Sequence, residues 1–110
     1  MPAASSAAAR EVSHHKVLIV GAGAAGIATA SSLLARDASL DIAIIDPADV
    51  HYYQPGWTMV GAGVFRAAST ARTLASTVPA AVRWIKAAVQ GFDPQAQTVS
   101  LDDGRQVSYE

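Results

Sequence analysis

Three glycines near the start of the chain have the spacing of a phosphate-binding turn. Gly21, Gly23 and Gly26 form the pattern G-x-G-x-x-G, directly after a predicted strand at residues 16–20, of which residues 17–20 are all apolar. In such a turn the first glycine allows a tight bend, and the second lets a pyrophosphate approach the backbone. The third brings the following helix close to the sheet. These residue types therefore predict a site for a phosphorylated ligand, with glycines that serve packing alone as the alternative.

The elements around these glycines complete the pattern. A helix is predicted over Ala24–Arg36, so the free N–H groups of Ala24 and Ala25 and the positive end of the helix dipole face the phosphates. A second apolar strand is predicted at residues 41–45, and it ends on Asp46. A carboxylate at that place accepts hydrogen bonds from a ribose. Strand, glycine turn, helix and acid together predict a dinucleotide-binding βαβ unit.

The residues around Asp46 bear on which dinucleotide would bind. A bare acid suits a free ribose diol, as in NAD or in the adenosine of FAD. NADP would need a nearby arginine for its 2′-phosphate, and the next arginine or lysine after Asp46 is Arg66. The sequence therefore favours NAD or FAD over NADP.

Composition excludes several other classes of function. The 110 residues suffice for one small domain. Basic and acidic residues number 8 and 9, so no basic stripe points to nucleic acid. The chain has no cysteine, which excludes disulfides, thiolate nucleophiles and cysteine-ligated metals within it. The pair His14 and His15 has no obvious third ligand for a metal, so we expect it to be solvated.

An uncharged stretch at residues 17–35 has the length of a membrane span. Its glycines stand in motif spacing, so we expect a buried strand and helix instead of a transmembrane helix. Residues 1–15 lack the apolar core of a signal peptide and are expected to form a flexible leader. The predicted domain then covers residues 16–110. Nothing in the sequence fixes an oligomeric state.

Residues 50–65 form a second informative segment, which is rich in aromatic residues and carries no charge. Pro55 and Gly56 indicate a turn within it. Large aromatic side chains on such a loop would either wall a flat ligand or cover the edge of the sheet, and both readings stay open. For His51 we expect a structural, hydrogen-bonded role over that of a proton carrier.

The second half of the chain reads as a short helix followed by strands. Ser69 is a candidate N-cap for a helix through Thr77, and a third strand is predicted at residues 82–89. A turn at residues 92–94 and a hairpin with strands at 98–101 and 106–109 follow. The predicted fold is α/β: a partial Rossmann-like βαβ FAD/NAD(P)-binding domain with a C-terminal antiparallel β-meander. Such a domain normally has further parallel strands, so we expect an N-terminal part of a longer enzyme.

The sequence from about residue 16 onward resembles the sulfide:quinone oxidoreductases, flavoproteins related to the disulfide reductases. The glycine motif belongs to that whole superfamily. The stretch Tyr-Tyr-Gln-Pro-Gly-Trp-Thr at residues 52–58 is more specific to the sulfide branch, and Asp46-Pro47 also belongs to the resemblance. The family more often has glutamate where this chain has Asp46.

The resemblance implies that FAD is the cofactor and where it would lie. Its pyrophosphate would lie over the glycine turn and its adenosine ribose on Asp46. The backbone of Val89 would meet the adenine, and residues 54 and 55 would approach the cofactor. The implied cofactor-binding residues are Gly21, Gly23, Ala24, Ala25, Gly26, Asp46, Pro47, Gln54, Pro55 and Val89.

The resemblance also implies a reaction. Sulfide would be oxidised on paired cysteines, and electrons would pass through FAD to a membrane quinone. Such enzymes are peripheral or monotopic membrane proteins. Because this chain has no cysteine, the catalytic residues and the membrane contact are expected beyond Glu110, and the isolated chain is expected to be inactive. Two alternatives remain: a type II NADH dehydrogenase or other FAD/NAD(P)-dependent oxidoreductase, and a non-catalytic dinucleotide-binding module.

Overall fold

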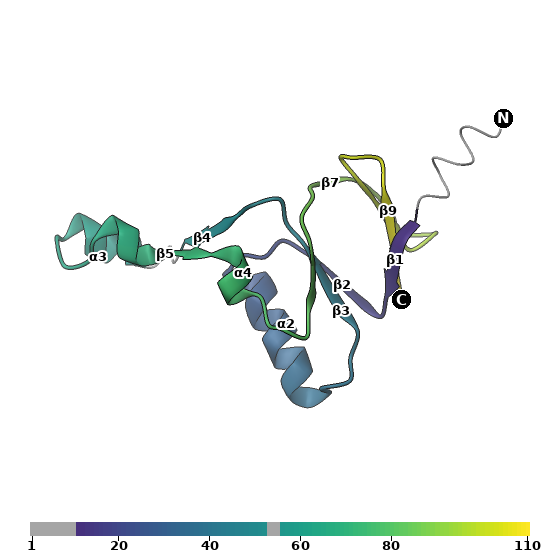
Figure 1. Ribbon diagram of the computed structural model, residues 1–110, viewed down its shortest axis with the longest axis horizontal. Helices are drawn as coiled ribbons and strands as arrows, with labels where there is room; N and C mark the ends of the chain where they lie inside the picture. The colour runs from purple at the N-terminus through teal and green to yellow at the C-terminus, as the bar shows by residue number, and fades with distance from the viewer. Residues whose placement is uncertain (1–10, 53–55) are drawn as a thin grey trace.

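A parallel sheet of three strands forms the centre of the molecule (Figure 1). The computed structural model describes residues 11–52 and 56–110. The strands are β2 (Val17–Val20), β3 (Ile42–Ile45) and β6 (Arg83–Ile85), in the order β2-β3-β6. Because the three strands are parallel, their carboxyl ends all lie at one edge, where ligands bind in open α/β sheets. The predicted Rossmann-like α/β fold is confirmed.

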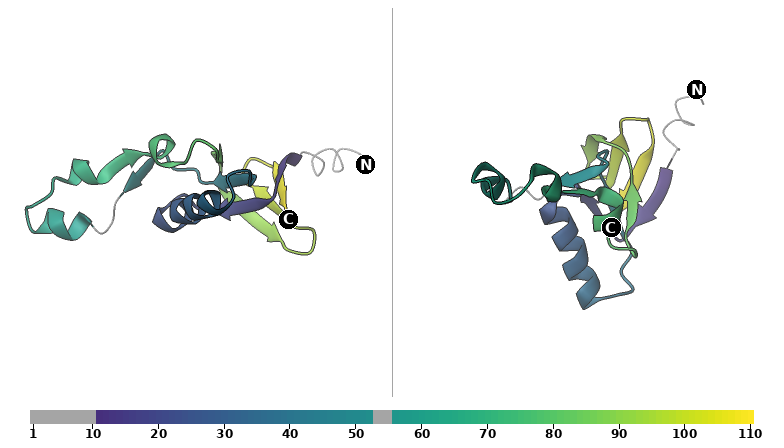
Figure 2. Two further views of the ribbon diagram at one scale, coloured as in Figure 1. Left: turned by 90° about the horizontal axis from the view of Figure 1, so that it is seen from below. Right: turned by 60° about the vertical axis from the view of Figure 1, so that its left-hand side comes forward.

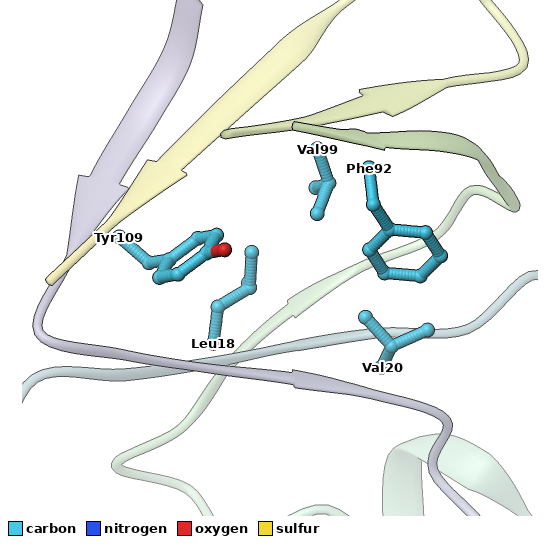
Figure 3. Close-up of a pocket in the computed structure, with 5 residues that line it drawn as sticks. All are labelled: Leu18, Val20, Phe92, Val99 and Tyr109. Atoms are coloured by element: carbon cyan, nitrogen blue, oxygen red, sulfur yellow. The ribbon is translucent and has the colours of Figure 1, made fainter. Parts of the chain in front are cut away.

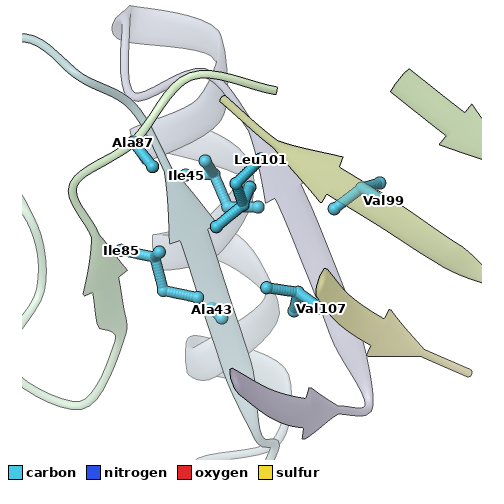
Figure 4. Close-up of a cluster of buried hydrophobic side chains, with 7 residues drawn as sticks. All are labelled: Ala43, Ile45, Ile85, Ala87, Val99, Leu101 and Val107. Carbon is cyan, nitrogen blue, oxygen red and sulfur yellow. The ribbon is translucent and has the colours of Figure 1, made fainter. Parts of the chain in front are cut away.

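Strand β3 is buried on both faces because layers of structure cover both sides of the sheet. Ile42 and Ile44 pack in the cluster under the helix, whereas Ala43 and Ile45 pack in the cluster under the second sheet. Figure 4 shows this second cluster, in which Ile45 and Leu101 lie together. An unbroken apolar run is what a strand with two buried faces requires.

The helix α2 (Ala24–Arg36) has the bounds that the sequence predicts. Ala30 is fully buried, and Ile27 and Leu33 pack beside it on the sheet. Small residues on the inner face let the helix axis lie close to the strands. The Asp37 amide, which donates to the Leu33 carbonyl, closes the last turn.

The second sheet contains the predicted antiparallel meander and one strand that the sequence did not predict. Its meander strands are β7 (Val89–Asp93), β8 (Thr98–Leu101) and β9 (Gln106–Tyr109). Strand β1 (Glu11–His15) pairs with β9 in parallel. The predicted leader is therefore too long at its C-terminal end, because backbone pairing with β9 orders these five residues.

His15 differs from its prediction for the same reason. Its side chain is buried, with Nδ1 2.9 Å from Asp41 Oδ1 and Nε2 2.7 Å from Ser13 Oγ. Only His14 of the pair is exposed. The alternation of strand β1 sends the two rings to opposite faces, so a solvated pair is wrong for His15.

The predicted third strand is in fact two strands in two sheets. Strand β6 ends at Ile85, and the Ala87 amide folds back to donate to the Ile85 carbonyl at 3.0 Å. Val89 then begins β7 and pairs with Leu101. Apolar residues continue through the crossing because both sheets share one core, so the sequence shows no break. Strand β7 also includes Phe92 and Asp93, where a turn was predicted.

An arm extends away from the two sheets (Figure 2) and gives the molecule its longest dimension of 60 Å. It consists of β4 (Val50–Tyr52), α3 (Trp57–Gly61), η2 (Ala67–Thr70) and β5 (Ala71–Thr73). Strand β5 pairs with β4, and α4 (Leu74–Thr77) follows at the base of the arm.

The arm changes two predictions. The helix predicted from Ser69 through Thr77 is wrong over residues 71–73, because cross-strand pairing with β4 draws them into a strand, and only residues 74–77 form the α-helix α4. Ser69 Oγ instead donates to the Arg66 carbonyl. The arm extends outward, so its apolar residues 56–65 do not cover the edge of the sheet. None of the helices among the described residues is long and apolar enough to cross a membrane.

Candidate dinucleotide-binding site

Two glycines of the motif are required by the folded chain itself. Gly21 has a φ of +104°, a conformation that side chains disfavour, and its amide donates to the Ile45 carbonyl at 2.8 Å. A Cβ atom on Gly26 would lie 1.9 Å from the Gly21 carbonyl oxygen. The turn off β2 and the close approach of α2 thus account for both glycines without a ligand.

Gly23 is different, because the chain itself has no need for a glycine there. It is the N-cap of α2, its φ of −76° suits any residue, and a Cβ atom would meet no protein atom within 4 Å. The space above it is open. An interpretation of the motif as packing alone accounts for Gly21 and Gly26 but leaves Gly23 unexplained, whereas a ligand that approaches the backbone explains it.

The N-terminus of α2 is suited to an anion. The first amides of a helix have no acceptor within it, and Gly23 has no side chain to cap them. Ala24 and Ala25 are exposed, and the first turn carries no acidic residue that would compete with a phosphate. The predicted phosphate-binding residues therefore lie together at the edge where β2 ends.

Asp46 lies beside the same turn, directly after β3. Its Oδ2 accepts a hydrogen bond of 2.8 Å from the Ala22 amide, and its Oδ1 accepts one of 2.8 Å from the Ala48 amide. Each carboxylate oxygen can accept a further hydrogen bond, so both are available to ribose hydroxyls. The residue is only partly buried. The structure thus brings the predicted acid and the glycine turn together, with exposed Pro47 next to them.

Trp84, which no sequence motif singles out, also contacts this region. The indole Nε1 of Trp84 on β6 donates to the Asp46 carbonyl at 3.0 Å. A tryptophan in a predicted strand normally indicates core packing, and its spacing from Asp46 gives no signal. Only the pairing of β3 with β6 brings the two together.

The other predicted site residues are not brought together in this way. Gln54 and Pro55 lie outside the described residues. Val89 is at the start of β7 and half-buried, not at the end of a parallel strand. His51 lies in β4 opposite Arg72. Within residues 11–52 and 56–110, no group of three histidine or acidic side chains is placed to hold a metal ion.

An apolar hollow of about 250 Å³ lies between β2 and the meander (Figure 3). Leu18, Val20 and Phe92 line it, together with Val99 and Tyr109. Because this lining contains no charged group, the hollow is unsuited to a pyrophosphate. The polar features that suit a dinucleotide lie instead at the glycine turn.

Charged groups with shifted pKa values lie in turns and at β9. A hydrogen bond from Ser39 lowers the pKa of Asp37 just after α2. A hydrogen bond from Arg105 lowers the pKa of Asp103 in the β8–β9 turn, and the pKa of Arg105 is raised in return. Hydrogen bonds from Lys16 and then His14 lower the pKa of Glu110. The three carboxyl groups are exposed and Arg105 is half-buried, and their hydrogen bonds stabilise local structure.

Comparison with known proteins decides the family. The family model described as pyridine nucleotide-disulphide oxidoreductase matches residues 15–110. The chain belongs to this family. The matched range includes the glycine turn, Asp46 and the meander. Since the members of this family are FAD-dependent, the prediction of FAD as the cofactor is confirmed.

Two curated relatives of this chain are sulfide:quinone oxidoreductases. The mitochondrial sulfide:quinone oxidoreductase of Mus musculus is 36% identical over 96 residues, which is 87% of this chain and 21% of that protein. The mitochondrial sulfide:quinone oxidoreductase of Schizosaccharomyces pombe is 39% identical over 113 residues, covering 88% of this chain and 25% of that protein. The predicted resemblance is confirmed, and the chain spans about a quarter or less of these relatives.

Solved structures agree on the fold. The sulfide:quinone oxidoreductase from Aquifex aeolicus matches 90% of this chain and 23% of that chain, with a TM-score of 0.73 at 23% identity. A putidaredoxin reductase in its covalent complex with putidaredoxin matches 87% of this chain and 24% of that chain, with a TM-score of 0.68 at 27% identity. The pairing of a parallel sheet with a meander is thus shared across different enzymes.

Proposed function

We propose that this chain binds the adenosine diphosphate half of FAD in a flavoenzyme of the sulfide:quinone oxidoreductase type. One observation carries the proposal. The space above Gly23 is open, the uncapped N-terminus of α2 borders it, and Asp46 lies beside the same turn. The groups that would bind the pyrophosphate and the carboxylate that would bind the ribose are thereby assigned to the same turn.

The residues divide the cofactor among them. The amides of Gly23, Ala24, Ala25 and Gly26 bind the pyrophosphate, and the dipole of α2 adds to the attraction. Asp46 accepts hydrogen bonds from the adenosine ribose, and Pro47 ends the strand beside it. The remaining assignments follow the family resemblance: the Val89 backbone for the adenine, and Gln54 and Pro55 for the flavin side.

The substrates follow from the relatives' names, which specify sulfide and quinone. When bound, FAD supplies two-electron redox chemistry between the two. The 110 residues include no cysteine, so the thiols that would carry oxidised sulfur are not among them. We assign to this chain the holding and orienting of the cofactor, and to the complete enzyme an association with the membrane that contains its quinone.

Ligand titration of the chain tests the binding proposal. FAD and FMN are added separately, and flavin fluorescence anisotropy is followed. FMN is the matched control because it carries the same flavin without adenosine. We expect FAD to bind much more tightly than FMN. Equal binding of the two would show that the adenosine half is not recognised.

A chimera tests whether this chain can hold the cofactor in an enzyme of this type. The chain replaces the matching portion of the mouse relative, and sulfide-dependent quinone reduction is measured. We expect turnover together with bound FAD, and a matched chimera with Gly23→Val should have neither. A chimera that folds but lacks FAD, or that retains FAD and shows no sulfide-dependent turnover, would refute the assignment of this chain to an enzyme of this type.

A further inference from the structure

The main chain of Asp46 depends on strand β6 for its position. The Asp46 amide donates to the Ile85 carbonyl at 3.2 Å, as in a continued parallel ladder. The Asp46 carbonyl accepts from the Trp84 indole at 3.0 Å. The amide and the carbonyl of Asp46 are thus both held by neighbouring residues of strand β6. Trp84 lies 38 positions after Asp46 in the sequence.

The indole takes the place of a missing backbone donor. If the β3–β6 ladder continued, the Ala87 amide would donate to the Asp46 carbonyl. That amide donates instead to the Ile85 carbonyl at 3.0 Å, because the chain turns there toward the meander. Without Trp84, a carbonyl next to the glycine turn would lose this hydrogen bond, and the main chain of Asp46 would be held by its amide alone.

Trp84 is itself firmly placed. It lies opposite Ile44 in the sheet and packs against the buried cluster under α2, so the ring has little freedom. A rigid donor fixes the Asp46 carbonyl, and the Ala22 and Ala48 amides fix its carboxylate. The side chain is thereby directed at the glycine turn.

We propose that Trp84 is a positioning residue for Asp46 and that it sets the preference of the site for an adenosine with a free ribose 2′-hydroxyl. This inference rests on the proposed function, because it assumes that Asp46 binds the ribose. Trp84 itself acts on the ligand only through the acid.

A pair of nucleotides separates positioning from general stability. ADP and 2′-deoxy-ADP are titrated by calorimetry into the full chain and into Trp84→Phe, which keeps an aromatic ring without the N–H. We expect the unaltered chain to prefer ADP, and the variant to lose about threefold to tenfold of that preference, as for one hydrogen bond. Trp57→Phe is the matched control. Trp57 lies in the arm, and ADP has no flavin that the arm could contact. The preference of Trp57→Phe for ADP over 2′-deoxy-ADP should therefore equal that of the unaltered chain.

A double-mutant cycle tests whether Trp84 acts through Asp46. In an Asp46→Ala background, Trp84→Phe should change the ADP preference no further. A benzothienyl analogue of tryptophan at position 84, which has the same shape but no N–H, gives the same test if Trp84→Phe fails to fold.

Several outcomes would overturn the inference. An equal loss of affinity for both nucleotides in Trp84→Phe would leave Trp84 a purely structural role. Additive effects in the double-mutant cycle would mean that Trp84 does not act through Asp46. An unaltered chain that binds FAD but shows no preference for ADP over 2′-deoxy-ADP would also overturn the inference. Failure of that chain to bind FAD or ADP would instead refute the proposed function itself.

Discussion

The glycine turn and the arm show opposite relations between sequence and structure. In the turn, contacts within the chain dictate the residue types: Gly26 faces a backbone oxygen, and Gly21 has a positive φ. In the arm, large apolar side chains are exposed, with Trp57 at 50% and Val64 at 63%. The turn is therefore determined by its own fold, whereas few contacts within the chain determine the arm.

Short elements explain the difference. The arm contains three-residue strands and a five-residue helix, which are marginal without tertiary packing. The turn lies between β2, which is a strand of the central sheet, and the thirteen-residue helix α2, which packs on that sheet. Substitutions in the two regions should thus differ in kind: those in the turn should disturb folding or ligand binding, and those in the arm should disturb stability little.

The largest effect is expected from Gly26→Ala. A methyl group 1.9 Å from the Gly21 carbonyl oxygen forces α2 off the sheet, at a cost on the order of 4 kcal/mol. Thermal or urea unfolding followed by circular dichroism measures it. Gly61→Ala is the matched control, because Gly61 is also helical but has open space around its Cβ position. If both variants unfold at the same denaturant concentration, the turn is not the constraint that the geometry indicates.

Gly23→Val should separate binding from folding. The side chain enters the open space above the helix N-terminus, so we expect FAD retention to be lost. Folding should change little, by about 1 kcal/mol for a poor N-cap residue. Flavin absorbance after gel filtration and a denaturant titration measure the two quantities. Normal flavin content would move the pyrophosphate away from Gly23.

The parallel sheet and α2 could be predicted because local pattern and tertiary contacts agree there. Apolar runs flanking a glycine turn have few alternatives, and the helix bounds follow from Gly23 at one end and Asp37 at the other. The tight turn at Gly21 and the close approach of the helix at Gly26 are also as predicted, and the structure brings Asp46 beside the same turn. The role of Gly23 in binding a ligand stays a prediction.

The remaining features depend on contacts that are distant in sequence. Strand β1 forms by pairing with β9, and strand β5 forms by pairing with β4. The sequence pattern does not show where the chain crosses from β6 to β7, because both sheets bury apolar residues in one core. Trp84 was missed at the candidate site for the same reason, since no local pattern connects an indole to a carbonyl 38 residues earlier.

A smaller effect is expected in the arm. Phe65 is 42% exposed, so Phe65→Ser should change the free energy of unfolding by no more than about 0.5 kcal/mol. Leu74→Ala is the contrasting variant, because Leu74 is fully buried at the base of the arm and its loss should cost about 2–5 kcal/mol. Urea unfolding of both variants gives the comparison. A cost for Phe65→Ser that approaches that of Leu74→Ala would mean that the arm is packed.

The smallest effect is a dependence on pH at the pairing of β1 with β9. Lys16 Nζ lies 3.0 Å from Glu110 Oε1, and this contact is the main reason why the Glu110 pKa is below its ordinary value of 4.5. A lowered pKa stabilises the folded chain above pH 4.5, and that contribution is lost as the pH falls through the lowered value.

Amide exchange in β1 and β9, measured on both sides of pH 4.5, tests this dependence. The Glu110 amide, which donates to the His15 carbonyl at 3.2 Å, reports the pairing directly. After correction for intrinsic exchange, its protection should fall on acidification in the unaltered chain and fall less in Glu110→Gln. Asp37 and Asp103 titrate in both proteins, so the difference isolates Glu110. Equal losses of protection would mean that the ion pair adds nothing to β1, and that backbone pairing with β9 alone orders this strand.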